Sequence, residues 1–350
     1  MAAPRERHTR RALSAARGRL QKAALKLVGW LAIGCLILRL LPVLKQALRS
    51  LEYVSPAWII GAIALETVSE FGYVVAWRSI VDPENLLERD GRGARTGTRA
   101  AWAQLGAGIV VPGGALANVG VGAWILRRFG MPVRTIAERQ FNLSFLNTAV
   151  DAVALVLLGS GLAVGVLGSE HEPLLTIVPA ACAAAGISVV VLVARSADTY
   201  SKRLEDAHAK LASTIRLVAD AVDATYRIIF RRAHRGSLLG AVAYLGFDNL
   251  VLWTAFYAIH ARHVPGYPSM VMAYIIGALG ASLPLPAGIG GVAGIAGMLV
   301  LYGVAHDAAV AAVLLYEAIG LLVPLVGGGI AYLLLKRAFG PMRELPAADA

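Results

Sequence analysis

Residues 100–126 read AAWAQLGAGIVVPGGALANVGVGAWIL, and residues 270–303 read MVMAYIIGALGASLPLPAGIGGVAGIAGMLVLYG. Both stretches are apolar, and proline with clustered glycine interrupts each of them near its middle. A chain in lipid must satisfy its own backbone hydrogen bonds, so irregular backbone is tolerated there only inside protein or along a water-filled cavity. Paired interruptions in the two halves of a membrane protein are therefore a sequence pointer to a transporter's binding site.

The rest of the chain has the composition of a membrane protein. Of its 350 residues, 57% are hydrophobic and 16% are charged, and the mean hydropathy is +0.65. Soluble domains are only about 45–50% apolar. The formal charge of +11 comes from basic residues that flank apolar stretches. We attribute it to membrane orientation and anionic headgroups, and we expect no nucleic-acid partner.

Six stretches are long and apolar enough to cross the hydrocarbon core, which takes about 20 residues of helix. They are 25–48, 58–77, 141–166, 174–194, 237–260 and 308–335. Each half of an interrupted stretch is too short to cross comfortably, so we predict that each stretch forms a re-entrant helical hairpin. The predicted fold is an all-α polytopic membrane protein with about six full spans and two re-entrant hairpins.

The distribution of Lys and Arg predicts how these segments are oriented. Residues 1–26 carry eight basic residues and 195–236 carry nine, whereas 167–173 and 303–307 carry none. The positive-inside rule then places both termini in the cytoplasm and makes the two hairpins enter from opposite sides. Three spans per unit invert the second unit, an architecture common among secondary transporters. The predicted organisation is a basic tail (1–24), a transmembrane domain (25–340, with repeats about 25–166 and 174–336 and a cytoplasmic amphipathic loop 195–236) and a C-terminal tail (341–350).

Two passages of the sequence resemble the lysylphosphatidylglycerol synthase transmembrane family. LPLPAGIGGVAGIAGMLVLYGV at 283–304, followed by LLYEAIGLLVPLVGGGIAYLLLKR at 314–337, is similar to the family's second break and last helix. VPGGALANVGVGAWILRRFG at 111–130, followed by AERQF at 137–141, is similar to its first break. The resemblance covers roughly residues 25–340 and implies a flippase-like domain, which occurs alone or fused to a soluble aminoacyl-lipid synthase. We expect no aminoacyl transfer from this chain.

Two departures from the family pattern leave the lipid specificity open. Residues 292–294 are Val-Ala-Gly, where the family commonly has an acidic residue. Glu317 stands where the resemblance leads one to expect an arginine.

Ionisable side chains inside predicted spans are candidate functional residues, because each costs about 2.5–3.5 kcal/mol to insert. Glu66 and Glu70 lie four residues apart on one helix face, and two carboxylates so placed repel, so that one tends to hold a proton. We predict that they bind a cationic headgroup or take part in proton coupling. The alternative is that they pair with an arginine such as Arg39, Arg78 or Arg127. Further candidates for a polar path are Asp151, Asp248 and Glu317.

The two breaks supply a second set of candidates. Free amides at half-helix N-termini favour anions such as phosphate, and we therefore predict that the break residues line the site. The alternative is close helix packing. An arginine beyond the first break can hold a lipid phosphate bidentately or simply fix the topology. These candidates are Pro112, Gly113, Gly114, Asn118, Arg127, Glu138, Arg139, Pro284, Pro286, Gly288, Gly290 and Gly291.

The function predicted from the sequence is lipid translocation. We expect movement of a phospholipid or lipid-linked headgroup between leaflets of the bacterial inner membrane, by alternating access. No enzyme motif, metal motif or cofactor motif is visible, so we expect neither catalysis nor a cofactor. The alternatives are a lipid-modifying enzyme or partner of a separate lipid synthase, and a small-solute transporter. The expected partner is an anionic or aminoacylated phospholipid, and a homo-oligomer stays open.

Overall fold

The computed structural model describes residues 54–89, 95–110, 115–168, 173–196, 217–223, 235–279 and 289–339. Every regular element in these ranges is a helix, which confirms the all-α class. Five helices are long and apolar enough to cross a membrane, consistent with a polytopic membrane protein. They are α2 (Pro56–Val81), α6 (Val133–Ala163), α7 (Pro173–Arg195), α10 (Arg235–Ala258) and α13 (His306–Phe339). The expected span at 25–48 and most of the amphipathic loop lie outside the described residues.

The long helices extend beyond the apolar windows from which they were predicted. The largest difference is at α6, which begins at Val133 although its apolar stretch was expected to begin at 141. Pro132 precedes the helix in an extended conformation, with φ −62 and ψ 143. Proline fixes φ and cannot donate from its nitrogen, so a helix can start directly after it. The first two turns of α6 therefore carry polar residues that precede the predicted apolar stretch.

The two interrupted stretches form two pairs of short helices. The first pair is α4 (Thr96–Val110) and α5 (Ala115–Arg128), and the second is α11 (Tyr267–Ala278) and α12 (Ile289–Leu301). The members of each pair pack against each other. None exceeds 15 residues, which at 1.5 Å per residue is about 22 Å and less than the hydrocarbon thickness.

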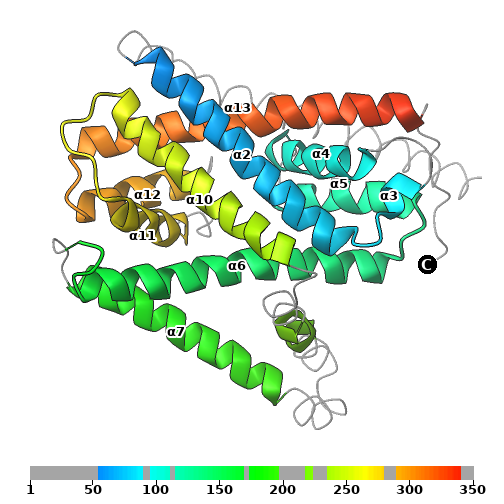
Figure 1. Cartoon of the computed structure of the whole chain (residues 1–350), viewed down its shortest axis with the longest axis horizontal. Helices are drawn as coiled ribbons and strands as arrows, with labels where there is room; N and C mark the ends of the chain where they lie inside the picture. The colour runs from blue at the N-terminus through cyan, green and yellow to red at the C-terminus, as the bar shows by residue number, and fades with distance from the viewer. Residues whose placement is uncertain are drawn as a thin grey trace, which may run out of the picture.

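Helices α2 and α10 pack antiparallel along most of their length and form the centre of the molecule (Figure 1). The Ser55 amide, just before α2, donates to the carbonyl of Ala258 at the end of α10 over 3.2 Å. Further along, the Ser69 hydroxyl donates to the Tyr244 carbonyl over 2.8 Å. These contacts place the start of α2 beside the end of α10, so the two helices run in opposite directions.

Each pair of short helices lies at a different end of this central pair. A Cβ at Gly97, at the start of α4, would lie 3.5 Å from Nε of Arg78 in the last turn of α2. At the other end, the indole N–H of Trp253, near the end of α10, donates to the Pro265 carbonyl just before α11 over 3.2 Å. Figure 1 shows α4 and α5 on the right and α11 and α12 on the left, with α6 and α13 running along opposite edges.

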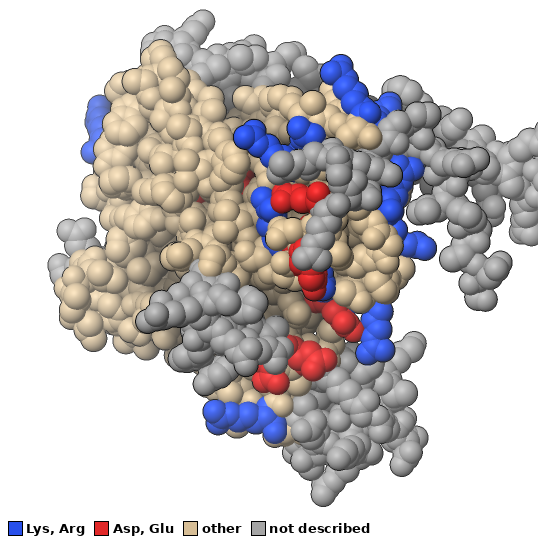
Figure 2. Space-filling view, turned by 45° about the vertical axis from the view of Figure 1, so that its right-hand side comes forward, with Lys and Arg blue, Asp and Glu red and all other residues tan. Residues whose placement is uncertain are grey.

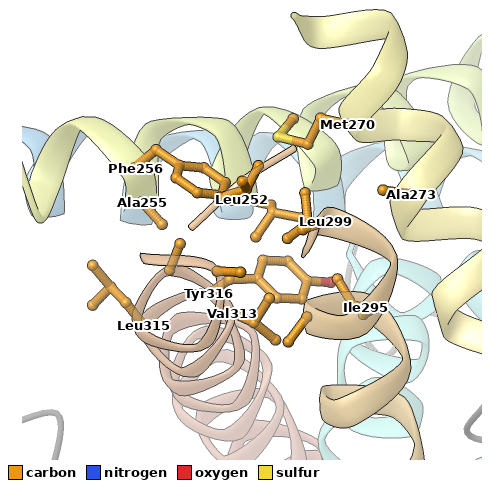
Figure 3. Packing of buried hydrophobic residues seen from close by; sticks show 14 of the residues in the cluster. Leu252, Ala255, Phe256, Met270, Ala273, Ile295, Leu299, Val313, Leu315 and Tyr316 are labelled. Carbon is orange, nitrogen blue, oxygen red and sulfur yellow. The ribbon is translucent and has the colours of Figure 1, made fainter. Parts of the chain in front are cut away.

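Apolar packing forms one core around each pair of short helices. The core beside α11 and α12 is shown in Figure 3, where side chains of α10, α11, α12 and α13 converge around the ring of Tyr316. The core beside α4 and α5 contains Trp77, Leu126, Ile136 and Leu146, all essentially inaccessible. Most of the charged residues visible in Figure 2 gather over the right half of the view, and most of the rest of the described surface carries no charged side chain.

Candidate functional site

Four carboxylates from three helices lie around a fifth, Asp248 on α10. Asp248 interacts electrostatically with Glu66 and Glu70 of α2, Asp151 of α6 and Glu317 of α13. The sequence pointed to each of these residues separately, and the structure brings them together. Each lies several turns from the ends of its helix, so the group sits in the interior of the helix bundle. We call these five residues the acidic cluster.

Glu66, Glu70 and Asp248 are shielded from solvent, Asp151 and Glu317 are partly exposed, and the acidic cluster lacks a described counter-charge. Glu66 and Glu70 are each 4% exposed, and Asp248 is 9% exposed. Among the described residues, none of the five carboxylates forms an ion pair within 4.0 Å. Like charges repel more strongly in a medium of low dielectric constant than in water, so these carboxylates repel one another if all are ionised.

The arginines first considered as partners for these carboxylates are engaged elsewhere or exposed. Arg78 pairs with Glu88 over 2.8 Å and donates to Asn85 over 3.0 Å. Arg127 is exposed in the last turn of α5. The alternative in which either arginine neutralises Glu66 and Glu70 is therefore wrong, while Arg39 lies outside the described residues.

Two tyrosines extend the acidic cluster toward the second helical pair. The Tyr316 hydroxyl donates to the carboxylate of Asp248, with distances of 2.9 and 3.1 Å to the two oxygens. It also lies 3.3 Å from the hydroxyl of Tyr274 on α11. These contacts join α10, α11 and α13 at one point. Tyr274 was missed by the sequence analysis, although a lone tyrosine in the apolar stretch 270–278 could have indicated it.

A second buried polar network joins α2, α4 and α6. The Gln104 amide oxygen accepts from the Trp77 indole over 2.8 Å and from the Gln140 amide over 3.0 Å. The Gln104 amide nitrogen donates to Gln140 over 3.1 Å and to the Tyr73 hydroxyl over 3.3 Å. Gly122 of α5 lies directly against Gln104, where a Cβ would collide with the amide. The sequence alone did not indicate this glutamine pair, because neither residue is charged.

The basic residues near the first helical pair lie away from the acidic cluster. Arg139 of α6 donates to the Val81 carbonyl over 3.0 Å and binds both carboxylate oxygens of Glu84, at 2.9 and 2.8 Å. Val81 lies at the end of α2, about 22 Å beyond Glu66 along the helix axis. The candidate residues therefore form two groups, an acidic interior and a basic rim.

Other members of this rim make local contacts. Glu138 accepts from Arg134 one turn earlier over 2.8 Å, on an exposed face of α6. Arg128 lies over the Trp124 ring, 4.9 Å from its centroid, in a cation–π contact. Arg127 and Arg128 lie in the last turn of α5, at the mouth of the α4–α5 pair, and Arg139 lies near the start of α6; we call these three the basic rim.

The corner between α2 and α3 (Leu86–Arg89) is organised by Asp82. Its carboxylate accepts from the Leu86 amide over 2.7 Å and from the Leu87 amide over 3.3 Å. Burial raises the pKa of the Asp82 carboxyl, although these two amides act in the opposite direction. The corner therefore holds the start of α4 close to the end of α2.

The structure describes only some of the candidate residues at the two breaks. Pro112, Gly113, Gly114, Pro284, Pro286 and Gly288 lie outside the described residues. Asn118 and Gly290 are in the helical backbone of α5 and α12, but only their backbone is described. Gly291 is buried in the first turn of α12. Their predicted role in lining a site stays a prediction.

Replacing Arg139 with methionine should destabilise the protein by about 1–2 kcal/mol. The change removes a bidentate ion pair and a hydrogen bond to the C-terminal carbonyl of α2, an effect reduced because Glu84 is 47% exposed. Thermal unfolding in detergent measures it. The control is Arg134→Met, whose side chain is 91% exposed and should change stability little. Equal losses in both variants would contradict the assignment.

A comparison with protein families matches residues 27–328 to the lysylphosphatidylglycerol synthase TM region. The chain belongs to this family. The match spans both pairs of short helices and all five members of the acidic cluster. No curated protein matched the chain in a sequence search. Membership of this family, together with five apolar helices of membrane-spanning length, supports a lipid-related role in a membrane.

Proposed function

We propose that this family member is a lipid translocator that moves a phospholipid or lipid-linked headgroup between leaflets by alternating access. The observation that carries the proposal is the acidic cluster, in which four helices place five carboxylates in the bundle interior. Intramembrane ionisable groups are expensive and mark substrate or ion pathways.

The arrangement of the helices supports an inverted repeat in this proposal. Helices α2 and α10 are antiparallel, and each is followed by a pair of short helices and then by a long helix, α6 or α13. In the proposed topology, α4–α5 and α11–α12 are re-entrant hairpins that enter from opposite faces of the inner membrane. Both chain termini are then cytoplasmic. Inverted repeats of this kind move against each other around a central site.

In the proposed mechanism, each of the two polar networks acts as the gate on one side of the membrane. The Gln104 network joins α4 to α2 and α6, and the Tyr316 network joins α11 to α10 and α13. Each network thus connects the first helix of a short pair to two long helices of its own half. Alternating access requires that one gate opens while the other stays closed, and breaking one network at a time would do this.

The separation of charge supports an aminoacylated phospholipid as the cargo. A lipid phosphate fits guanidinium groups, which the basic rim presents near the mouth of the α4–α5 pair. An amine further along the same headgroup fits the carboxylates of the acidic cluster. A headgroup with both a phosphate and an amine can therefore contact the basic rim through its phosphate and then, as it moves inward, the acidic cluster through its amine.

A leaflet-exchange assay tests the proposal. Purified protein is reconstituted into liposomes with fluorescent lipids whose headgroups are amine-bearing, neutral or anionic. We expect faster exchange than in protein-free liposomes, most strongly for the amine-bearing lipid. Glu66→Gln should slow exchange of that lipid about tenfold or more, because a charge-assisted hydrogen bond contributes about 1.5–3 kcal/mol.

The control variant is Asp307→Asn, because this carboxylate is fully exposed at the start of α13. It should leave exchange unchanged. Exchange no faster than in protein-free liposomes, for all three lipids, would refute lipid translocation. Release of a chemically altered lipid would instead indicate an enzyme, and uptake of a soluble headgroup analogue would indicate a solute transporter.

A further inference from the structure

We propose that the acidic cluster binds and releases protons during each transport cycle, and so couples lipid movement to the proton gradient. This inference rests on the proposed function and adds the coupling ion to it. The process is a proton transfer between water and carboxylate oxygens, with no bond to lipid and no change of oxidation state. Its basis is the balance of hydrogen-bond donors and acceptors in the cluster.

The cluster has acceptor atoms to which the described residues offer no donor. Oε2 of Glu66 and Oε2 of Glu70 have no hydrogen-bond partner, although each residue is 4% exposed. The amide oxygen of Asn147, one turn before Asp151 on α6, has none either. Buried polar groups are nearly always paired, so the unpaired carboxylate oxygens of Glu66 and Glu70 indicate that the described part of the chain lacks donors for them.

Glu66 directs its carboxylate into this interior. A Cβ at Gly320 of α13 would lie 3.8 Å from its Oε1, and Glu317 is one turn away on the same helix. A proton on a carboxylate removes one negative charge and converts an acceptor into a donor. Protonation therefore relieves the repulsion with Asp248 and supplies a missing donor in a single step.

The geometry favours protons over a metal ion. Among the described residues, no three acidic, histidine or cysteine side chains come close enough together to hold a metal. The five carboxylates are spread over four helices around Asp248 instead of converging on one point. Separate protons on separate carboxylates fit this spread, whereas a single cation with several ligands does not.

The titratable groups facing Asp248 come from every helix packed against α10. Tyr316 is the one that connects proton binding to movement, because its hydroxyl donates to the Asp248 carboxylate and lies beside Tyr274. A proton on Asp248 weakens this contact, since a neutral carboxyl accepts a weaker hydrogen bond than a carboxylate. Proton uptake would thus loosen the junction of α10, α11 and α13. Within the described ranges, these groups are Glu66, Glu70, Asp151, Tyr244, Tyr267, Tyr274, Tyr316 and Glu317.

The test measures lipid exchange and proton flux in the same liposomes. Protein is reconstituted with an amine-bearing fluorescent lipid and a pH-sensitive dye in the lumen, and a gradient of one pH unit is imposed. We expect the lipid to accumulate in one leaflet by up to about tenfold for one proton per lipid. Proton movement should accompany it. Asp248→Asn should lose both responses, and Asp307→Asn should keep both.

Infrared difference spectra between acidic and neutral pH provide a second measurement on folded protein. The wild type should show a buried protonated-carboxyl band that is reduced in Asp248→Asn and in Glu70→Gln. Lipid exchange that does not depend on the pH gradient and is not accompanied by proton movement would refute proton coupling. It would still agree with the proposed lipid translocation. The absence of any lipid exchange would overturn both. A carboxyl band unchanged in both variants would also overturn the assignment to this cluster.

Discussion

Gly72→Leu should be the most destabilising single substitution in the central pair of helices. A Cβ at position 72 would lie 2.8 Å from the Gly240 carbonyl oxygen and 2.8 Å from the Tyr244 amide nitrogen. Both contacts are backbone atoms, so no side chain can move aside and α2 must separate from α10. Overpacking costs about 1–3 kcal/mol, and more where the backbone must shift. We expect a loss of at least that size.

The same substitution should also disturb function. The Ser69–Tyr244 hydrogen bond lies one turn from Gly72, and Glu70 of the acidic cluster lies between them. Unfolding followed by tryptophan fluorescence in detergent measures stability, and size-exclusion chromatography reports aggregation. Gly61→Leu is the matched control, because the same helix has nothing within 4 Å of a Cβ there. Similar melting temperatures for the two variants would show that the close crossing is wrong.

Gln104→Leu should destabilise the first half of the molecule by about 2–5 kcal/mol. The change leaves the Trp77 indole N–H and the Gln140 amide without partners in a buried position, where each unsatisfied group costs about 1–3 kcal/mol. Gln104 is 1% exposed, so water cannot easily replace the lost contacts. The measurement is again thermal or denaturant unfolding in detergent.

A double variant separates this hydrogen-bond effect from a packing effect. Replacing both glutamines with leucine removes donor and acceptor together, so Gln104→Leu with Gln140→Leu should be less destabilising than the sum of the single changes. Trp77→Phe removes one hydrogen bond and leaves a cavity in a fully buried position, so its cost should exceed the roughly 1 kcal/mol of the hydrogen bond alone. Strictly additive losses in the double variant would refute a direct contact between the two glutamines.

The sequence predicted the helices well because their signal is local. An apolar run of about 20 residues gives a membrane span whatever lies beside it. Helices α2, α7, α10 and α13 begin and end within four residues of the stretches expected for them. The predicted start of α6 lies eight residues after the observed one. Hydropathy indicates which residues lie in the hydrocarbon core, but a helix can continue beyond that core.

The acidic residues were found by a similarly local argument, but their grouping was not. Each carboxylate in an apolar run stands out on its own. That Glu66, Glu70, Asp151, Asp248 and Glu317 form one cluster follows from the antiparallel register of α2 and α10 and from how α6 and α13 pack on that pair. The expected single site of carboxylates and arginines separated into an acidic interior and a basic rim for the same reason.

By itself the sequence determined an all-helical, multi-pass membrane protein with two broken apolar stretches, and the residues around these two breaks indicated the family. Hydrophobicity, charge and proline are properties of single residues, so they can be read along the chain. Only the tertiary structure decided which residues meet. The two polar networks depend on helices far apart in sequence, and the crossing at Gly72 and Gly240 sets the register that brings Asp248 to Glu66. Contacts of this kind arise from packing geometry, which no local pattern contains.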